Sequence, residues 1–140
     1  MYGKTIGAAV VLAALAVASP ASAEKMTMKL NLNAASEVPP NDSAGKGTAD
    51  VTYDTTSKML TWKVTYSGLT GPATMAHFHG PAEPGKNAGI LVPFKDPASG
   101  AEGSATLTDA QAADLMAGKM YVNVHTKAHP GGEIRAQVTK

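Results

Sequence analysis

The stretch Ala49-Asp-Val-Thr-Tyr-Asp-Thr-Thr-Ser-Lys-Met-Leu-Thr-Trp-Lys-Val-Thr-Tyr66 decides the fold class of this chain. On both sides of the turn Thr55-Thr-Ser57, apolar residues alternate with polar ones. This period of two is typical of a strand with one buried face. Two such segments joined by a short polar turn predict an antiparallel hairpin near the middle of the chain.

The same alternation continues outward from this hairpin. It is found at residues 26–32, 75–79, 103–107, 120–126 and 133–139, and residues 90–92 form a further short candidate. One helix is expected near residues 109–117, because Thr108 and Gln111 form a capping box and Gly118 is a typical C-terminal stop. We expect its Ala112, Leu115 and Met116 to face the sheets. The pattern predicts an all-β Greek-key sandwich of about seven short strands with one short helix.

The first 23 residues are typical of a signal peptide. Lys4 precedes an uncharged apolar run from Ile6 to Ala18, and Ala21-Ser-Ala23 has the small residues of a cleavage site. A retained N-terminal anchor is the alternative. We predict a signal peptide at residues 1–23 and one domain at residues 24–140, in the periplasm or secreted and free of the membrane after cleavage.

Composition excludes several classes of function. The chain has no cysteine, so disulfides, thiolate nucleophiles and Cys-ligated metals are excluded. Without Lys4, the twelve Lys and Arg residues become eleven and balance the eleven Asp and Glu residues. A neutral chain with scattered charges gives no reason to expect nucleic-acid binding. No serine elbow or phosphate loop is present, and no catalytic residue can be assigned.

All four histidines lie in two clusters, His77 with His79 and His125 with His129. Residues two apart in a strand share a face, so His77 and His79 can approach one ion. His125 has the same phase, opposite to the aliphatic residues of its strand, which puts these histidines on the outer, solvent side of the sheet. If the two strands are neighbours, the side chains converge, with His129 in reach from the turn. We therefore predict a surface metal site formed by these four residues.

Imidazoles without thiolates suit copper, zinc or nickel, and intrinsic affinity favours Cu(II), with zinc as the possible alternative. Met75 shares the face of the histidine pair and could add a thioether ligand, although a packing role at the rim is the simpler interpretation. For the histidines themselves, the alternative is that they hydrogen-bond across strands at the surface without metal.

Three polar neighbours have both a functional and a structural interpretation. Glu133 could orient an imidazole N–H or pair with a nearby cation. Arg135 could draw an anion toward the metal, or pair with Glu133 or Asp50. Asn123 could hydrogen-bond within the site or be a solvated strand residue. The structural interpretation is preferred for Glu133 and Arg135.

Several segments resemble the CHRD domain, a module named after chordin and present alone in many exported bacterial proteins. The matching segments begin at Leu32, Ala76, Leu115 and Pro130, with the sequences Leu-Asn-Ala-Ala-Ser-Glu-Val-Pro-Pro, Ala-His-Phe-His-Gly-Pro-Ala, Leu-Met-Ala-Gly-Lys-Met-Tyr-Val-Asn-Val-His-Thr and Pro-Gly-Gly-Glu-Ile-Arg-Ala-Gln-Val. The resemblance implies a β-sandwich of immunoglobulin or superoxide dismutase type. The histidine pattern is also similar to the copper site of copper–zinc superoxide dismutase, but that family's additional zinc ligands and its usual disulfide are missing here.

Three functions follow from these features, in order of preference. The first is copper binding for storage, delivery or protection. The second is a copper-dependent redox enzyme with a superoxide dismutase-like activity, so whether the protein is an enzyme stays open. The third is an adhesion or interaction module that uses the loop at residues 80–100, with no protein partner indicated by the sequence.

Overall fold

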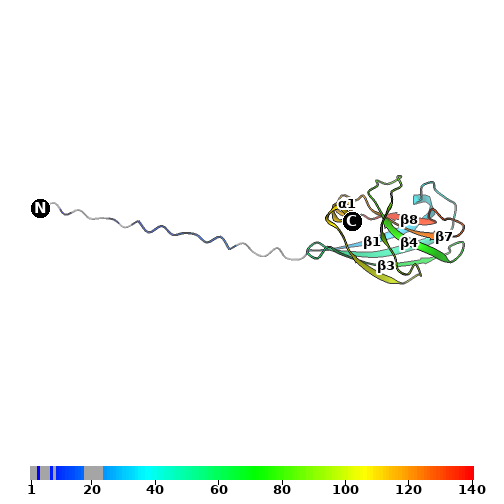
Figure 1. Ribbon diagram of the computed structural model, residues 1–140, viewed down its shortest axis with the longest axis horizontal. Coiled ribbons are helices and arrows are strands. Elements are labelled where there is room, and N and C mark those ends of the chain that lie inside the picture. Colours follow the sequence, from blue (N-terminus) through cyan, green and yellow to red (C-terminus); the bar gives the residue numbers. More distant parts are fainter. Residues whose placement is uncertain (1–2, 4–6, 8, 18–23) are drawn as a thin grey trace.

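The computed structural model describes residues 3, 7, 9–17 and 24–140 (Figure 1). Residues 9–17 have no regular secondary structure, and their side chains are exposed. The predicted cleavage site at residues 21–23 lies outside the described residues. Among the residues that are described, no helix has the length and apolar character needed to cross a membrane.

Eight strands, one α-helix and one short 3-10 helix make up the part of the chain that the structure describes. In chain order they are β1 (Lys25–Asn33), η1 (Ala34–Ser36), β2 (Lys46–Asp54), β3 (Met59–Ser67), β4 (Ala73–His79), β5 (Ile90–Pro93), β6 (Glu102–Thr106), α1 (Asp109–Met116), β7 (Tyr121–Thr126) and β8 (Ile134–Gln137). The predicted all-β class with one short helix is confirmed. The additional strand is β5, which the sequence offered only as a short candidate.

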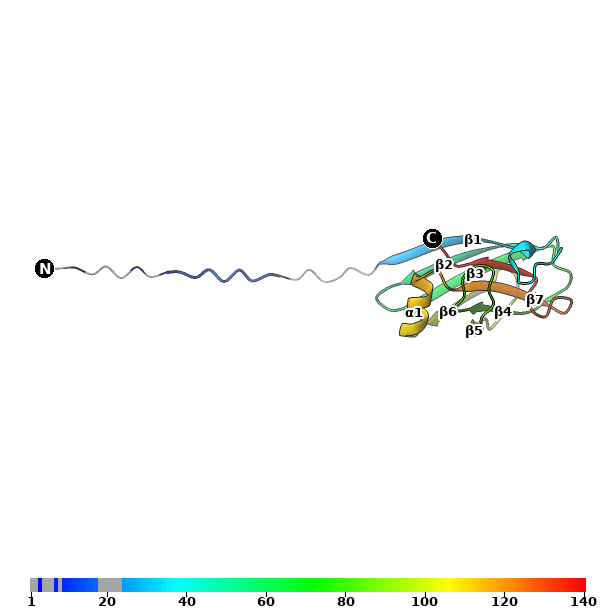
Figure 2. The ribbon, with the colours of Figure 1, turned by 90° about the horizontal axis from the view of Figure 1, so that it is seen from above.

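The strands form one antiparallel sheet in the order β5-β4-β7-β8-β1-β2-β3-β6. Its two halves, β5-β4-β7-β8 and β1-β2-β3-β6, are joined between β1 and β8 by the single pair Asn33 and Arg135. The sheet curls until the edge strands β5 and β6 line one cleft, so it is nearly closed and resembles a sandwich (Figure 2). The inner faces of both halves enclose the core.

The period-two alternation places the core residues as expected. Along β1, buried and exposed residues alternate without exception, and its register with β2 puts Met28 opposite Val51. From the other half, Phe78 of β4 is fully buried and meets Trp62 of β3 edge to face, with the ring centroids 5.1 Å apart. Phe94 stacks on Trp62 at 4.9 Å. These aromatic contacts hold the two halves together.

Helix α1 begins and ends where the sequence indicates. Thr108 and Gln111 form the expected capping box, and Gly118 has the positive φ of 72° that favours glycine. Leu115 is buried, whereas Met116 is 53% exposed, so the expectation that Met116 faces the sheets is wrong. One residue turns a helix by about 100°. An eight-residue helix at the rim can therefore bury only the narrow stripe with Ala112 and Leu115.

Leu60 is fully buried on β3, so shortening its side chain should destabilise the protein. Leu60→Ala should lower the free energy of unfolding by about 2–5 kcal/mol, because it removes buried apolar surface and leaves a cavity. Lys63→Ala, at an exposed position of the same strand, should change it by less than about 0.5 kcal/mol. Urea denaturation of both variants measures this difference, and equal effects would contradict the assignment of the buried face.

Candidate metal centre

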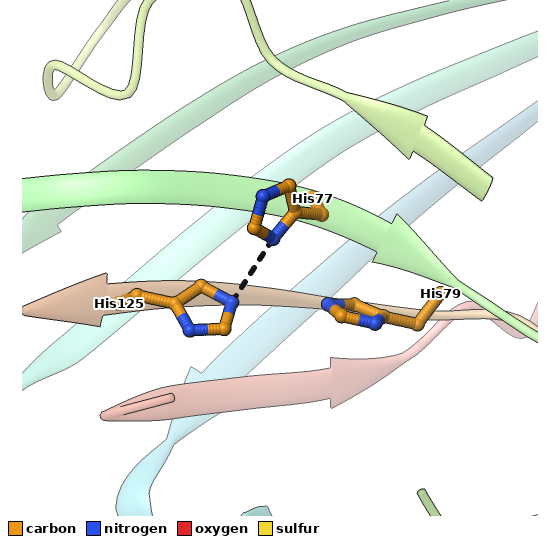
Figure 3. A group of neighbouring side chains, drawn as sticks. All are labelled: His77, His79 and His125. Atoms are coloured by element: carbon orange, nitrogen blue, oxygen red, sulfur yellow. Dashed lines mark hydrogen bonds between the residues drawn. The ribbon is translucent and has the colours of Figure 1, made fainter. Parts of the chain in front are cut away.

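Three histidines converge because β4 and β7 are neighbouring antiparallel strands. The register pairs Met75 with His125, His77 with Asn123 and His79 with Tyr121. Residues opposite each other in such a pair share a face, so His77, His79 and His125 all project to the outer face of the sheet. Figure 3 shows the three rings gathered over β4 and β7.

The geometry of the cluster is tight. One ring nitrogen from each histidine lies within 4.8 Å of the other two. Nδ1 of His77 is 3.1 Å from Nε2 of His125, and the ring centroids of His77 and His79 are 5.3 Å apart. The group could hold a metal ion.

The cluster is buried, which corrects the prediction of a surface site. His77, His79 and His125 are exposed by only 5%, 7% and 5%. The phase of the strands was correct, but the loop at residues 80–89 and the turn at residues 127–132 cover this face. Their carbonyl oxygens reach the rings, Ala88 at 3.1 Å from His79 Nδ1 and Pro130 at 2.9 Å from His125 Nδ1. Strand alternation distinguishes the two faces and carries no information about what covers the outer one.

These carbonyls influence which ring nitrogen carries the proton. A carbonyl oxygen only accepts hydrogen bonds, so Nδ1 of His125 donates to Pro130. In the neutral form of His125, Nε2 then carries a lone pair, which can accept a hydrogen bond from Nδ1 of His77 at 3.1 Å. A backbone carbonyl at the far nitrogen is the usual arrangement around a metal-binding histidine.

Burial also keeps two of the rings uncharged. Desolvation, helped by the nearby rings of His125 and His79, lowers the pKa of His77 from 6.5 to about 4. Desolvation also lowers the pKa of His79, although its contacts with Ala88 and Asn123 act in the opposite direction. Both imidazoles are therefore neutral at neutral pH, the form in which histidine binds metals.

The structure does not bring the other two candidate ligands into this group. His129 lies in the turn after β7, outside the three-histidine cluster, with Nε2 3.9 Å from a carboxylate oxygen of Glu133. Met75 shares the face of His125 but is 49% exposed at the rim.

Glu133 points away from the cluster of His77, His79 and His125, contrary to the phase expected from its strand. Its fully buried carboxylate accepts hydrogen bonds from Thr70, Thr126 and Ser43 on the opposite side. Burial would raise the pKa of Glu133, but these hydrogen bonds outweigh it and hold the pKa below its usual value. β8 begins only at Ile134, after Gly132 with a φ of 123°, so strand alternation does not extend to Glu133.

Arg135 is buried beside the site and pairs with neither Glu133 nor Asp50. Its guanidinium lies 3.5 Å from the centre of the Tyr121 ring and donates to Asn87 and to the carbonyl of Lys86. Its pKa is lowered, chiefly by burial. These hydrogen bonds fasten the loop at residues 80–89 over the histidines. Because Arg135 is only 1% exposed, it is not available to attract anions from solvent.

Two further residues shape the site. Tyr121 stacks on His79 with centroids 4.7 Å apart, and its hydroxyl hydrogen-bonds Ala88. Glu37, in the loop after η1, is 3% exposed beside Asn123. Burial raises its pKa to about 7, against the lowering effects of Asn123, Arg135 and Val38. Glu37 lies about ninety residues before His125 of β7, and its only sequence signal is membership of the Leu32–Pro40 motif.

Together, the curled antiparallel sheet and the buried histidine cluster define an all-β domain with a candidate metal centre. A model of the CHRD domain family matches residues 28–138. The chain therefore belongs to the CHRD domain family, as the sequence motifs indicated. No curated protein and no solved structure matches it significantly.

The lowered pKa of His77 predicts how stability depends on pH. Below pH 6.5 the unfolded chain takes up a proton at this ring that the folded chain refuses until about pH 4, so the contribution of His77 to stability falls as the pH drops through this range. Glu37 acts with the opposite sign, because its pKa is higher in the folded state.

The effect of His77 is isolated by comparing variants. In metal-free protein, the change in unfolding free energy between pH 7 and pH 5 should be less destabilising for His77→Gln than for the unaltered chain. Chemical denaturation at the two pH values measures it. Identical changes in the two proteins would mean that His77 is not shielded as described.

Proposed function

We propose that this protein is an exported copper-binding protein, for copper storage, delivery or protection, and that its site consists of His77, His79 and His125. The observation that carries the proposal is the convergence of three buried imidazoles from two strands. Burial lowers the pKa of His77 and of His79 and so opposes their protonation. A metal ion that binds their nitrogen lone pairs would stabilise these buried rings.

The distances between the ring nitrogens of the three histidines fit one metal ion after a small movement of the rings. Two nitrogens, each about 2.0–2.1 Å from a metal, lie about 3 Å apart when they adjoin and about 4 Å apart at opposite positions. His77 Nδ1 and His125 Nε2 share a hydrogen bond at 3.1 Å in the metal-free chain, and this separation matches the first case once a metal ion replaces the shared proton. The upper limit of 4.8 Å within the group requires a ring to move by roughly 1 Å or less.

Copper is favoured over other metals by the donor set. The chain has no cysteine, so imidazole nitrogens are the main donors, and their intrinsic affinity for divalent first-row metals is highest for copper. Zinc suits the same geometry and is the main alternative. Export is supported by the charged, apolar and small-residue segments of the first 23 residues, which are typical of a signal peptide.

Metal titration of the chain without residues 1–23 tests the proposal. The protein should bind one Cu(II), and His77→Gln, His79→Gln and His125→Gln should each weaken binding by more than about 100-fold. Removing a direct ligand should cost more than removing one of its supports, which costs 10–100-fold. Competition with a chelator of known affinity measures these changes.

His129→Gln is the matched control, since it removes a histidine outside the cluster. It should change the affinity by less than about threefold. If His129→Gln weakened binding as much as the other three substitutions, or if all four variants kept full affinity, the proposed site would be wrong. Binding of Zn(II) in preference to Cu(II) under competition would reject copper and retain the site.

A further inference from the structure

Asn123 links the histidine cluster to a buried carboxyl group. Its Oδ1 lies 2.9 Å from Nε2 of His79. On its other side, Nδ2 lies near Glu37 Oε1, which is buried and has no hydrogen-bond partner. Asn123 nevertheless lowers the pKa of Glu37. Gly132 makes this approach possible, because a Cβ atom at that position would overlap both Glu37 Oε1 and Asn123 Nδ2.

His79 has a hydrogen-bond acceptor at each ring nitrogen. Nδ1 faces the carbonyl of Ala88, and Nε2 faces the amide oxygen of Asn123. A neutral imidazole has one N–H and can satisfy only one of them. Which contact is satisfied decides which nitrogen keeps its lone pair. Donation to Ala88 leaves Nε2 free for a metal, whereas donation to Asn123 blocks it.

The charge on Glu37 would favour one of these two forms. A carboxylate only accepts hydrogen bonds, so it requires the Nδ2 side of Asn123. The amide oxygen must then face His79, and His79 must carry its proton on Nε2. The carboxylate of Glu37 would thus influence, through the orientation of Asn123, which nitrogen of His79 carries the proton.

We propose that Glu37 is a positioning residue that, acting through Asn123, holds the proton of His79 on Nε2 and so restrains metal binding. The inference rests on the proposed function for its consequence, but the contact of His79 with Asn123 and the position of Glu37 beside Asn123 exist without metal. Metal binding at Nε2 requires the proton to move to Nδ1, which then donates a hydrogen bond to the carbonyl of Ala88. It also requires Asn123 to turn away. The binding-competent form is a minor one, which lowers the apparent affinity by its population.

Glu37→Gln tests this directly, because an amide can donate as well as accept and no longer imposes one orientation on Asn123. At about pH 8.5 the unaltered Glu37 is a carboxylate, since its raised pKa is about 7. In metal-free protein, nitrogen-15 NMR should find the His79 proton on Nε2 in the unaltered chain and shifted toward Nδ1 in Glu37→Gln. Binding of Zn(II), measured by chelator competition, should become about three- to tenfold tighter.

A merely structural role for Glu37 predicts weaker binding, the opposite direction. An unchanged tautomer, or an unchanged or weaker affinity for Zn(II), overturns the inference. The control is Glu83→Gln, at an exposed position of the loop after β4, which should alter neither readout. Asn123→Ala gives a second route, because it removes the acceptor and should also move the proton to Nδ1. Adding Glu37→Gln to it should then have no further effect.

The outcome separates the two proposals. A chain that binds neither Cu(II) nor Zn(II) refutes the proposed function, and the tautomer of His79 in metal-free protein then decides the role of Glu37 alone. A chain that binds metal, but whose tautomer ignores Glu37, keeps the function and rejects the inference.

Discussion

The antiparallel pairing of β4 with β7 is the contact on which the candidate metal centre depends. It places His77 across from Asn123 and brings His125 beside them on the same face. A shift of one residue in this register would turn one strand over and send its histidines into the core. The register is fixed from the inner side, where Phe78 is opposite Val122 and Ala76 is opposite Val124, all of them buried. The same packing that stabilises the two halves of the sheet therefore aligns the site.

Polar contacts hold loops over the outer face of β4 and β7, so that this face is buried. Arg135 and Tyr121 hold the loop at residues 80–89, and Asn87 of that loop also donates to Val38 in the segment after η1. These segments exclude water from the histidines, which strengthens every electrostatic interaction among them. The arrangement explains why the pKa values of His77 and His79 are lowered and why Glu37, at the edge of the same layer, has a raised pKa.

Much of this organisation could be predicted from the sequence, and the reasons for the rest are physical. Alternation identified the strands and the shared phase of His77, His79 and His125, because it depends only on the period of a strand. It failed at Glu133, where the positive φ of Gly132 precedes β8, and at Met116, on a helix too short to bury two faces. Strand alternation could not predict the covering loops or the place of Glu37 beside Asn123, since contacts between distant segments depend on how the sheet curls. The family motifs contained Glu37 but carried no information about its partner.

The rings of His77, His79 and His125 are proposed to bind a single metal ion. A crystal structure of the copper-loaded protein, with anomalous scattering measured at the copper edge, tests this proposal most directly. If all three rings bind the ion, one strong anomalous peak is expected among them, within about 2.0–2.2 Å of a nitrogen from each ring. A peak at His129 or Met75 instead, or copper bound in solution with no peak among these rings, would contradict it.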